Sequence, residues 1–191
     1  GICAAGNSML SNASGKYYCL IGSDDIMMPQ KLETEVALLE HSCADICGVY
    51  SKAYLMETEG VVRYDILLGG DYKGDSPEGN ILDDLIRGNF IPAMCTLFKR
   101  ECIVAVGGYN EQIQYEDYPL WLRLAETYKF IYSRYVGAAY RTTPGSLSRQ
   151  IKNWYPSYLQ AYRLLKDQEN KVLQEKIFEI AKDACLVKDR K

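Results

Sequence analysis

A short apolar segment that runs directly into two adjacent carboxylates constrains this 191-residue chain most strongly. The five residues 17–21 are aromatic, aliphatic or cysteine, which predicts a central strand buried on both faces. A Gly-Ser turn ends this strand, and Asp24 and Asp25 follow at once. Because ligand sites in open α/β sheets lie at the carboxyl ends of strands, the segment predicts an α/β fold with a site at the two aspartates.

Two interpretations of the Asp24–Asp25 pair are open at this point. A turn followed by a helix cap is the commoner use of a Ser-Asp-Asp triplet, since serine and aspartate are usual capping residues. A cap needs only one side chain, however, and two adjacent carboxylates repel each other. A hard cation that also holds phosphate oxygens would use both carboxylates, so the rest of the chain must decide between a cap and a metal site.

The composition is that of an ordinary globular protein. Hydrophobic residues make up 48% of the chain and charged residues 25%, and the length suits about one domain. The formal net charge of −3 argues against nucleic acid as the main partner. No apolar run approaches the ~20 residues of a membrane-spanning helix.

The cysteines favour reduced thiols over disulfides or a zinc site. Their number is odd, none forms a C-x-x-C pair, and the single histidine, His41, is the only imidazole partner for a metal. Most lie within apolar stretches, where a thiol fills a core position, and this indicates the cytoplasm. The seven are Cys3, Cys19, Cys43, Cys47, Cys95, Cys102 and Cys185.

Hydrophobic periodicity and turn residues predict alternating helices and strands. We expect helices at residues 2–13, 29–41, 80–87, 101–106 and 116–127, and further strands at residues 44–56, 61–64, 93–99 and 130–136. In the helix at 29–41, Leu32, Val36 and Leu39 form an apolar stripe and Glu35 lies off it. The glycine-rich segment 65–79 has the length of a lid or a disordered tip.

A helical pattern returns from residue 154 to residue 187. Residues 152–191 hold nine basic and six acidic residues, a net of +3, so the first 151 residues carry −6. A basic helical segment can lie against a membrane surface or a partner. A packing helix with a solvated charged face is the favoured interpretation.

A second acidic pair stands at the start of the helix predicted at 116–127. Glu116 and Asp117 lie where the helix dipole favours negative charge, and Trp121 lies on the apolar face of that helix. N-terminal capping would explain this pair if it stood alone. Together with the Asp24–Asp25 pair it indicates a division of roles, in which one pair holds a cation and a carboxylate outside the metal serves as general base.

The order and spacing of these motifs resemble the family 2 glycosyltransferases of the GT-A fold. In that family a segment like N-x-G-x-x-x-A-R-N precedes A-x-G-x-Y-I, a D-x-D-D-like acidic motif and P-x-K-L. The matching segments here are residues 4–7, 13–18, 22–25 and 29–32, which read AAGN, ASGKYY, GSDD and PQKL. The family's later G-G-[FY]-[ND]-E, E-D-x-x-L-W-L-R-L and Y-R-x-x-x-x-S-x-S are matched by residues 107–111, 116–124 and 140–148. Each motif alone is weak, but their order and spacing over residues 1–150 are strong.

The resemblance implies a partial GT-A fold, which is a Rossmann-like mixed sheet with flanking helices, and a C-terminal helical segment. Residues 1–150 would be the distal part of the GT-A domain and residues 151–191 a helical extension. The family begins with a strand like S-V-I-I-P-T-Y-N and a βαβ portion that grips the base and ribose, and neither occurs here. We therefore expect residues 17–21 to be a sheet edge through which copies self-associate, and we expect this chain alone to lack transferase activity.

The resemblance also implies metal-assisted transfer of a sugar from a nucleoside diphosphate sugar to an acceptor hydroxyl, with inversion at the anomeric carbon. Asp25 and Asp24 would bind Mn²⁺ or Mg²⁺ together with the donor, and Asn7 falls within a motif that implies donor binding. By similarity, Asp117 would be the base that takes the acceptor proton, and Glu116 would orient the acceptor.

Tyr109 and Trp121 are candidates for contact with the acceptor sugar, although a core position is the favoured interpretation for Trp121. The expected acceptor is a glycan or a lipid-linked molecule in polysaccharide or cell-envelope glycan synthesis. Such work is expected in the cytoplasm or at the inner face of the membrane, with peripheral membrane contact.

Three positions depart from the family pattern. Gly22 replaces the first aspartate of the commoner acidic motif, and Gly6 stands where an arginine is usual. Thr143 falls near a histidine that many members carry, so a third protein ligand to the metal is not predicted.

Two other function classes stay open. A metal-dependent hydrolase of nucleotide sugars could use Asp25 and Asp117, and would consume the donor without an acceptor. A non-catalytic fragment or interaction module would bind neither metal nor nucleoside diphosphate. Binding and acceptor dependence therefore separate the three classes.

Overall fold

The computed structural model describes residues 1–68, 76–113, 115–144 and 155–188. Within them, the strands form two four-stranded sheets of mixed direction. The first sheet has the order β1-β6-β3-β7, with β1 Tyr17–Tyr18, β6 Thr96–Lys99, β3 Ile46–Tyr50 and β7 Lys129–Tyr132. The second has the order β2-β8-β4-β5, with β2 Ile26–Met27, β8 Ala138–Arg141, β4 Ala53–Met56 and β5 Val62–Leu68.

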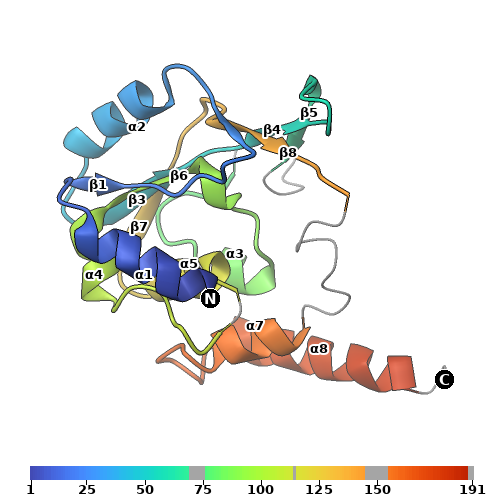
Figure 1. Ribbon diagram of the computed structural model, residues 1–191. Coiled ribbons are helices and arrows are strands. Elements are labelled where there is room, and N and C mark those ends of the chain that lie inside the picture. Colours follow the sequence, from blue (N-terminus) through green and yellow to red (C-terminus); the bar gives the residue numbers. More distant parts are fainter. Residues whose placement is uncertain (69–75, 114, 145–154, 189–191) are drawn as a thin grey trace.

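The helices cover the first sheet on both faces. Figure 1 shows α2 on one side of this sheet and α1, α4 and α5 on the other, with α7 and α8 as a further layer. The helices are α1 Ile2–Asn12, α2 Lys31–Glu40, α3 Leu82–Arg87, α4 Arg100–Ala105, α5 Asp117–Ala125, α7 Tyr155–Tyr162 and α8 Lys171–Lys188, and a 3₁₀ turn, η1, spans Ala93–Cys95. No helix among the described residues is long and apolar enough to cross a membrane.

Side chains of the first sheet alternate between two hydrophobic clusters. Val49 and Leu97 point to the α2 side, where they pack with Leu39. Their neighbours Tyr50 and Phe98 point to the α5 side. Since successive residues of a strand face opposite sides, a sheet buried on both faces favours apolar residues at successive positions, as at residues 49–50 of β3 and 97–98 of β6.

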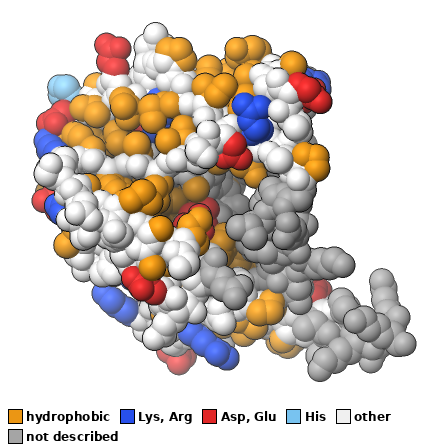
Figure 2. All heavy atoms as spheres, viewed as in Figure 1, with side chains coloured by type: hydrophobic (Ala, Val, Ile, Leu, Met, Phe, Trp, Pro, Cys, Tyr) orange, Lys and Arg blue, Asp and Glu red, His pale blue; other side chains and the backbone are white. Residues whose placement is uncertain are grey.

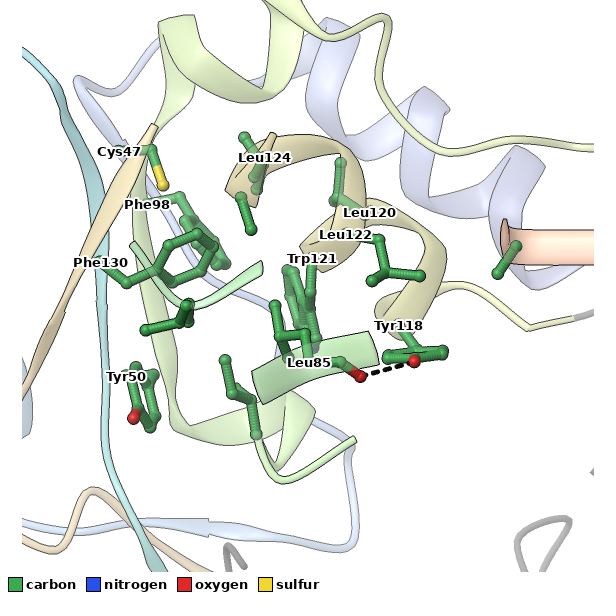
Figure 3. Close-up of a cluster of buried hydrophobic side chains, with 14 of the residues drawn as sticks. Cys47, Tyr50, Leu85, Phe98, Tyr118, Leu120, Trp121, Leu122, Leu124 and Phe130 are labelled. Carbon is green, nitrogen blue, oxygen red and sulfur yellow. Dashed lines mark hydrogen bonds between the residues drawn. The ribbon is translucent and has the colours of Figure 1, made fainter. Parts of the chain in front are cut away.

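The larger cluster centres on α5. Seven of its nine residues are buried, and Figure 3 shows Trp121 and Leu124 facing the aromatic side chains of the sheet. The Phe98 and Trp121 ring centroids lie 4.8 Å apart. At the other end of the cluster the Tyr118 hydroxyl donates to the Leu85 carbonyl at 2.7 Å. Side chains of α7 and α8 join the same cluster, namely Ala161, Tyr162, Leu173 and Ile180.

The strand predicted at 17–21 is shorter than expected and is not buried on both faces. Only Tyr17 and Tyr18 pair, with Lys99 and Phe98 of β6, and Ile21 is exposed. The ladder stops at Tyr18, opposite Phe98, before it reaches the start of β6 at Thr96. The prediction that this segment is a sheet edge is confirmed for the described residues, because β1 stands at one end of its sheet.

Other element predictions need similar corrections. The segment predicted as one strand at 44–56 is β3 and β4, which belong to different sheets and are joined at Ser51 and Lys52. The strand predicted at 93–99 begins as the turn η1, and the one at 130–136 ends at Tyr132. Strand β8 has no strand pattern of its own in the sequence, and pairing with β2 and β4 makes it regular. Residues 69–75, which are the middle part of the predicted lid at 65–79, lie outside the described residues.

The buried face of α2 differs from the predicted stripe. Leu32 is exposed, whereas Lys31 and Glu35 are fully buried beside Leu39. The helix is therefore rotated relative to the prediction by about one position, since residues at i and i+4 share a face. Two opposite charges at that spacing can neutralise each other, so burial of this face does not require apolar residues alone.

We predict that Gly48→Ala destabilises the fold strongly. A Cβ at Gly48 would lie 2.2 Å from Phe98 Cδ1 and 2.8 Å from the Leu97 carbonyl oxygen, in the middle of the first sheet. Overpacking of this kind costs about 1–3 kcal/mol of unfolding free energy. Urea denaturation should show the loss. Gly88→Ala is the matched control, because a Cβ at Gly88 would meet nothing within 4 Å, and equal stability of the two variants would contradict the packing described here.

Candidate functional site

A small pocket opens between β1, the η1–β6 corner, the turn before residue 110 and the start of α5. Its enclosed volume of about 30 Å³ has room for a water molecule or two. Figure 2 shows acidic and hydrophobic side chains side by side near a hollow in the middle of this view. The pocket is lined by Tyr18, Cys19, Leu20, Ala93, Thr96, Phe98, Tyr109, Glu116, Asp117 and Trp121.

Asp117 is the first residue of α5 and a wall of this pocket. Burial raises the pKa of its carboxyl group to about 7, and the neighbouring Glu116 carboxylate adds to the rise. Hydrogen bonds from the Tyr118 N–H, at 2.6 Å, and from Asn89 work in the opposite direction. A carboxyl group with a pKa near neutral pH is suited to accept and return a proton.

The side chains of this acidic pair do not form the helix cap that the capping interpretation requires. Glu116 occupies the cap position of α5 and makes no capping hydrogen bond with its side chain. Asp117 accepts from the N–H of the next residue in the helix and from the Asn89 side chain. Both carboxylates instead line the pocket, which leaves them available to a ligand.

Tyr109 reaches the pocket from a tight turn. Gly107 and Gly108 have φ angles of +86° and +67°, a left-handed conformation that favours glycine. Asn7 clamps the turn from α1, because its amide donates to the Tyr109 carbonyl at 2.9 Å and accepts from the Tyr109 N–H at 2.8 Å. Gly6 completes the fit, since a Cβ there would lie 2.8 Å from the Tyr109 ring.

Arg123 holds the same turn from the opposite side. Its guanidinium group donates to the Val106 carbonyl at 2.8 Å and to the Gly108 carbonyl. Because Arg123 belongs to α5, the turn that carries Tyr109 and the helix that begins with Asp117 form one unit. The position of Tyr109 in the pocket is thus fixed from α1 and from α5.

Trp121 lines the pocket with part of its side chain and also packs into the hydrophobic core. It is 3% exposed and its ring lies against Phe98, so the favoured core interpretation holds for most of the side chain. Its indole Nε1 has no hydrogen-bond partner within the described parts of the chain. A buried N–H without a partner is costly, and a bound ligand could relieve this cost.

The Asp24–Asp25 pair lies in the turn between β1 and β2, where Asp24 is exposed and Asp25 half-buried. The Arg141 N–H donates to Asp25 Oδ1 at 2.9 Å, and the Arg141 Nε–H donates to the Asp24 carbonyl at 2.8 Å. Arg141 also donates to the Thr58 carbonyl at 2.9 Å, which ties the turn to the β4–β5 hairpin. The end of β8 therefore fixes the acidic turn.

The two carboxylates converge over Gly22. A Cβ at this position would lie 2.8 Å from Asp24 Oδ1 and 3.1 Å from Asp25 Oδ2. Burial raises the pKa of Asp25 and the Asp24 charge raises it further, while the Arg141 N–H lowers it. Mutual repulsion of this kind is what a shared cation removes. In the described residues, no group of three or more His, Cys, Asp or Glu side chains could hold a metal, so a cation here would have two carboxylate ligands from the chain.

The structure brings together four of the predicted site residues in one pocket, namely Tyr109, Glu116, Asp117 and Trp121. Asp24, Asp25 and Asn7 are not among the residues that line it, and the Asn7 amide is engaged by the Tyr109 turn. The roles assigned to all seven residues stay predictions. Sequence reasoning gives no role to Arg141 beyond its Tyr-Arg motif, and none to the Tyr18 hydroxyl group.

Two curated proteins resemble this chain in sequence, and no model of a known protein family matches it. The amylovoran biosynthesis glycosyltransferase AmsE of Erwinia amylovora is 24% identical over 126 residues, which are 65% of this chain and 44% of AmsE. The uncharacterized glycosyltransferase MJ1057 of Methanocaldococcus jannaschii is 24% identical over 129 residues, which are 66% of this chain and 42% of MJ1057. The matched regions span less than half the length of these relatives.

A solved structure shows the same fold. Residues 1–349 of S. aureus TarS, in complex with UDP-GlcNAc, match with a TM-score of 0.62 over 90% of this chain and 50% of that chain, at 14% identity. This chain therefore has a mixed α/β fold that it shares with a nucleotide-sugar-bound protein. The predicted fold class, a mixed α/β arrangement with flanking helices, is confirmed.

The raised pKa of Asp117 predicts a pH-dependent stability. The folded state holds this proton up to about pH 7, whereas the unfolded state releases it near pH 4, so stability should fall as the pH rises between these values. Asp117→Asn should remove the fall and stabilise the fold at pH 8 by a few kcal/mol, at about 1.4 kcal/mol per pKa unit. Thermal unfolding at pH 5 and pH 8 tests this, and a variant that gains nothing at pH 8 would show that the folded pKa is ordinary.

Proposed function

We propose that the protein is an inverting glycosyltransferase that moves a sugar from a nucleoside diphosphate sugar to an acceptor hydroxyl. The observation that carries the proposal is Asp117, a carboxyl group with a pKa of about 7 in a pocket walled by Tyr109 and Trp121. The fold shared with TarS in its UDP-GlcNAc complex supports it. The two relatives named glycosyltransferases support the same class.

Asp24 and Asp25 would hold a divalent cation, Mn²⁺ or Mg²⁺, together with the donor. Their oxygens converge, Asp24 is exposed to solvent, and the set contains only hard oxygen ligands, which suits these two metals. When bound, such a cation offsets the negative charge that builds on the departing diphosphate. The chain's own contribution is to hold this turn in place, since Arg141 of β8 binds the Asp25 carboxylate and the Asp24 backbone carbonyl.

Asp117 would take the proton of the acceptor hydroxyl as that oxygen bonds to the anomeric carbon. The bond from this carbon to the diphosphate oxygen breaks on the opposite face, and its electron pair leaves with the nucleoside diphosphate. Glu116 would accept a hydrogen bond from another acceptor hydroxyl and so orient the sugar. Tyr109 and the unpartnered Trp121 N–H would contact the acceptor at the pocket walls.

The finer assignment follows from the motifs. We place the protein with the family 2, GT-A, hexosyl-transferring enzymes that build polysaccharide or cell-envelope glycans, and we propose a glycan or lipid-linked acceptor. The amylovoran relative supports a polysaccharide product. Six of the cysteines are free thiols, which supports action in the cytoplasm or at the inner face of the membrane. Self-association and a lack of activity in this chain alone stay predictions.

One observation favours a second candidate, the hydrolysis of nucleotide sugars. The pocket beside Asp117 has room for a water molecule or two, and the same base could activate a water. A transferase consumes donor in proportion to acceptor, whereas a hydrolase consumes it without one. Donor turnover measured with and without added glycan separates the two functions.

We predict that Asp25→Asn abolishes Mn²⁺-dependent binding of UDP and leaves the fold intact in a protein that also includes the base- and ribose-gripping segment. The turnover measurements below use the same protein. Loss of one of two carboxylates removes a charged metal ligand, while the amide can still accept from the Arg141 N–H. Isothermal titration calorimetry measures the binding. Asp45→Asn is the control, because this carboxylate lies on the surface in an ion pair with Lys129. Unchanged UDP binding by Asp25→Asn would contradict a metal role.

Asp117→Asn is expected to lower turnover about 10²–10⁴-fold, which is the usual contribution of a general base. Affinity for the donor should hardly change, since the lost interaction is made mainly in the transition state. Steady-state kinetics with the donor varied at fixed acceptor separates the two quantities. Loss of donor affinity at unchanged saturated turnover would assign Asp117 to binding instead of proton transfer.

A further inference from the structure

A fully buried ion pair lies between the two sheets. Lys31 and Glu35 occupy successive turns of α2, and both side chains have no exposed surface. The Lys31 ammonium group donates to a Glu35 carboxylate oxygen and, at 3.2 Å, to the Thr96 carbonyl. The other Glu35 oxygen accepts from the Ser51 hydroxyl at 3.3 Å. The pair is thus joined by hydrogen bonds to two segments outside its own helix.

These contacts reach the Asp117 pocket on one side and the link between the two sheets on the other. Thr96 starts β6 and lines the pocket that contains Asp117. Ser51 lies in the link between β3, in the first sheet, and β4, in the second. The pair therefore touches the point where the chain crosses from one sheet to the other, directly behind the pocket wall.

Gly137 connects the pair to the acidic turn. A Cβ there would lie 2.4 Å from Ser51 Oγ and 3.1 Å from Lys31 Cε, so the backbone before β8 runs directly over the pair. The Gly137 carbonyl accepts from the Met28 N–H at 2.9 Å, which sets the end of β2 against the start of β8. These two strands carry the Asp25 carboxylate and the Arg141 N–H that holds it.

Stability alone does not account for charges at this position. Taking two charges out of water costs several kcal/mol, and replacing a buried ion pair with apolar residues of similar size is often neutral or stabilising. The rest of the α2 interface is apolar, with Val36 and Leu39 on the sheet. The charges add directional hydrogen bonds. Each bond to Thr96 and Ser51 fixes the position of one atom relative to α2, whereas an apolar contact would let the two segments shift past each other.

We propose that Lys31 and Glu35 are positioning residues that set the Asp24–Asp25 turn relative to the Asp117 pocket. This inference rests on the proposed function, since the two groups must meet one donor and one acceptor in the transfer reaction. Neither residue contacts the reacting atoms; both act through Thr96 on one side and through Gly137 on the other.

The test replaces the pair with apolar residues of similar length, in the double variant Lys31→Met, Glu35→Met. We expect the free energy of unfolding to be unchanged or higher, while the Met28 and Arg141 amide protons exchange at least about tenfold faster because their carbonyl and carboxylate partners shift. Turnover should fall about 10- to 100-fold at little changed donor KM, as expected when reacting groups are misplaced by about 1 Å.

Lys16→Met, Glu40→Met is the matched control. This pair has the same residue types and also involves α2, but both side chains are exposed and the 2.7 Å contact lies away from the sheet junction. It should change neither the two exchange rates nor turnover. Ser51→Ala is the second test variant, because it removes only the hydroxyl that binds Glu35 and keeps both charges. It should change both readouts in the same direction by a smaller factor.

The outcomes separate this inference from the proposed function. A wild-type protein that includes the base- and ribose-gripping segment and still transfers no sugar would refute the proposed function, and the exchange rates would still decide whether the pair holds the acidic turn. Wild-type exchange rates and turnover in the folded double variant would overturn the inference. If the double variant fails to fold, unchanged exchange and turnover in Ser51→Ala would overturn it as well.

Discussion

The packing of α5 against the central sheet is the contact on which the rest of the structure depends. Trp121 lies on Phe98, and seven of the nine helix residues are buried, so the helix cannot move without opening the core. The first residue of this helix is Asp117. Its raised pKa is a consequence of how deeply α5 is packed, because burial of the helix start takes the carboxyl group out of water. Core packing and proposed chemistry thus share one element.

The sequence predicted α5 well, for a physical reason. Burial and chemistry there depend on one continuous segment, Glu116–Leu124, whose helical periodicity is local. The turn that carries Tyr109 could also be predicted from the sequence, because a left-handed conformation favours glycine and Gly107 and Gly108 are adjacent glycines. Their clamp by Asn7 joins residues about a hundred positions apart, and no local pattern indicates it.

The second sheet could not be predicted in the same way. Strand β8 is regular only because it pairs with β2 and β4, and β1 is a strand only where it pairs with β6. The predicted buried face of α2 was wrong because charged residues such as Lys31 and Glu35 usually face solvent. Both can be buried here because their charges neutralise each other. Pairing across the chain, between strands or between charges, is what the sequence did not reveal.

Whether Asp117 is the proton acceptor is tested most directly by NMR titration of its carboxyl carbon in the folded protein. We predict a midpoint near pH 7, since burial and the Glu116 charge both disfavour the ionised form. A base poised at neutral pH follows from that value. A midpoint near pH 4 would show an ordinary solvated carboxylate at the start of α5 and would contradict the assignment of Asp117 as the proton acceptor.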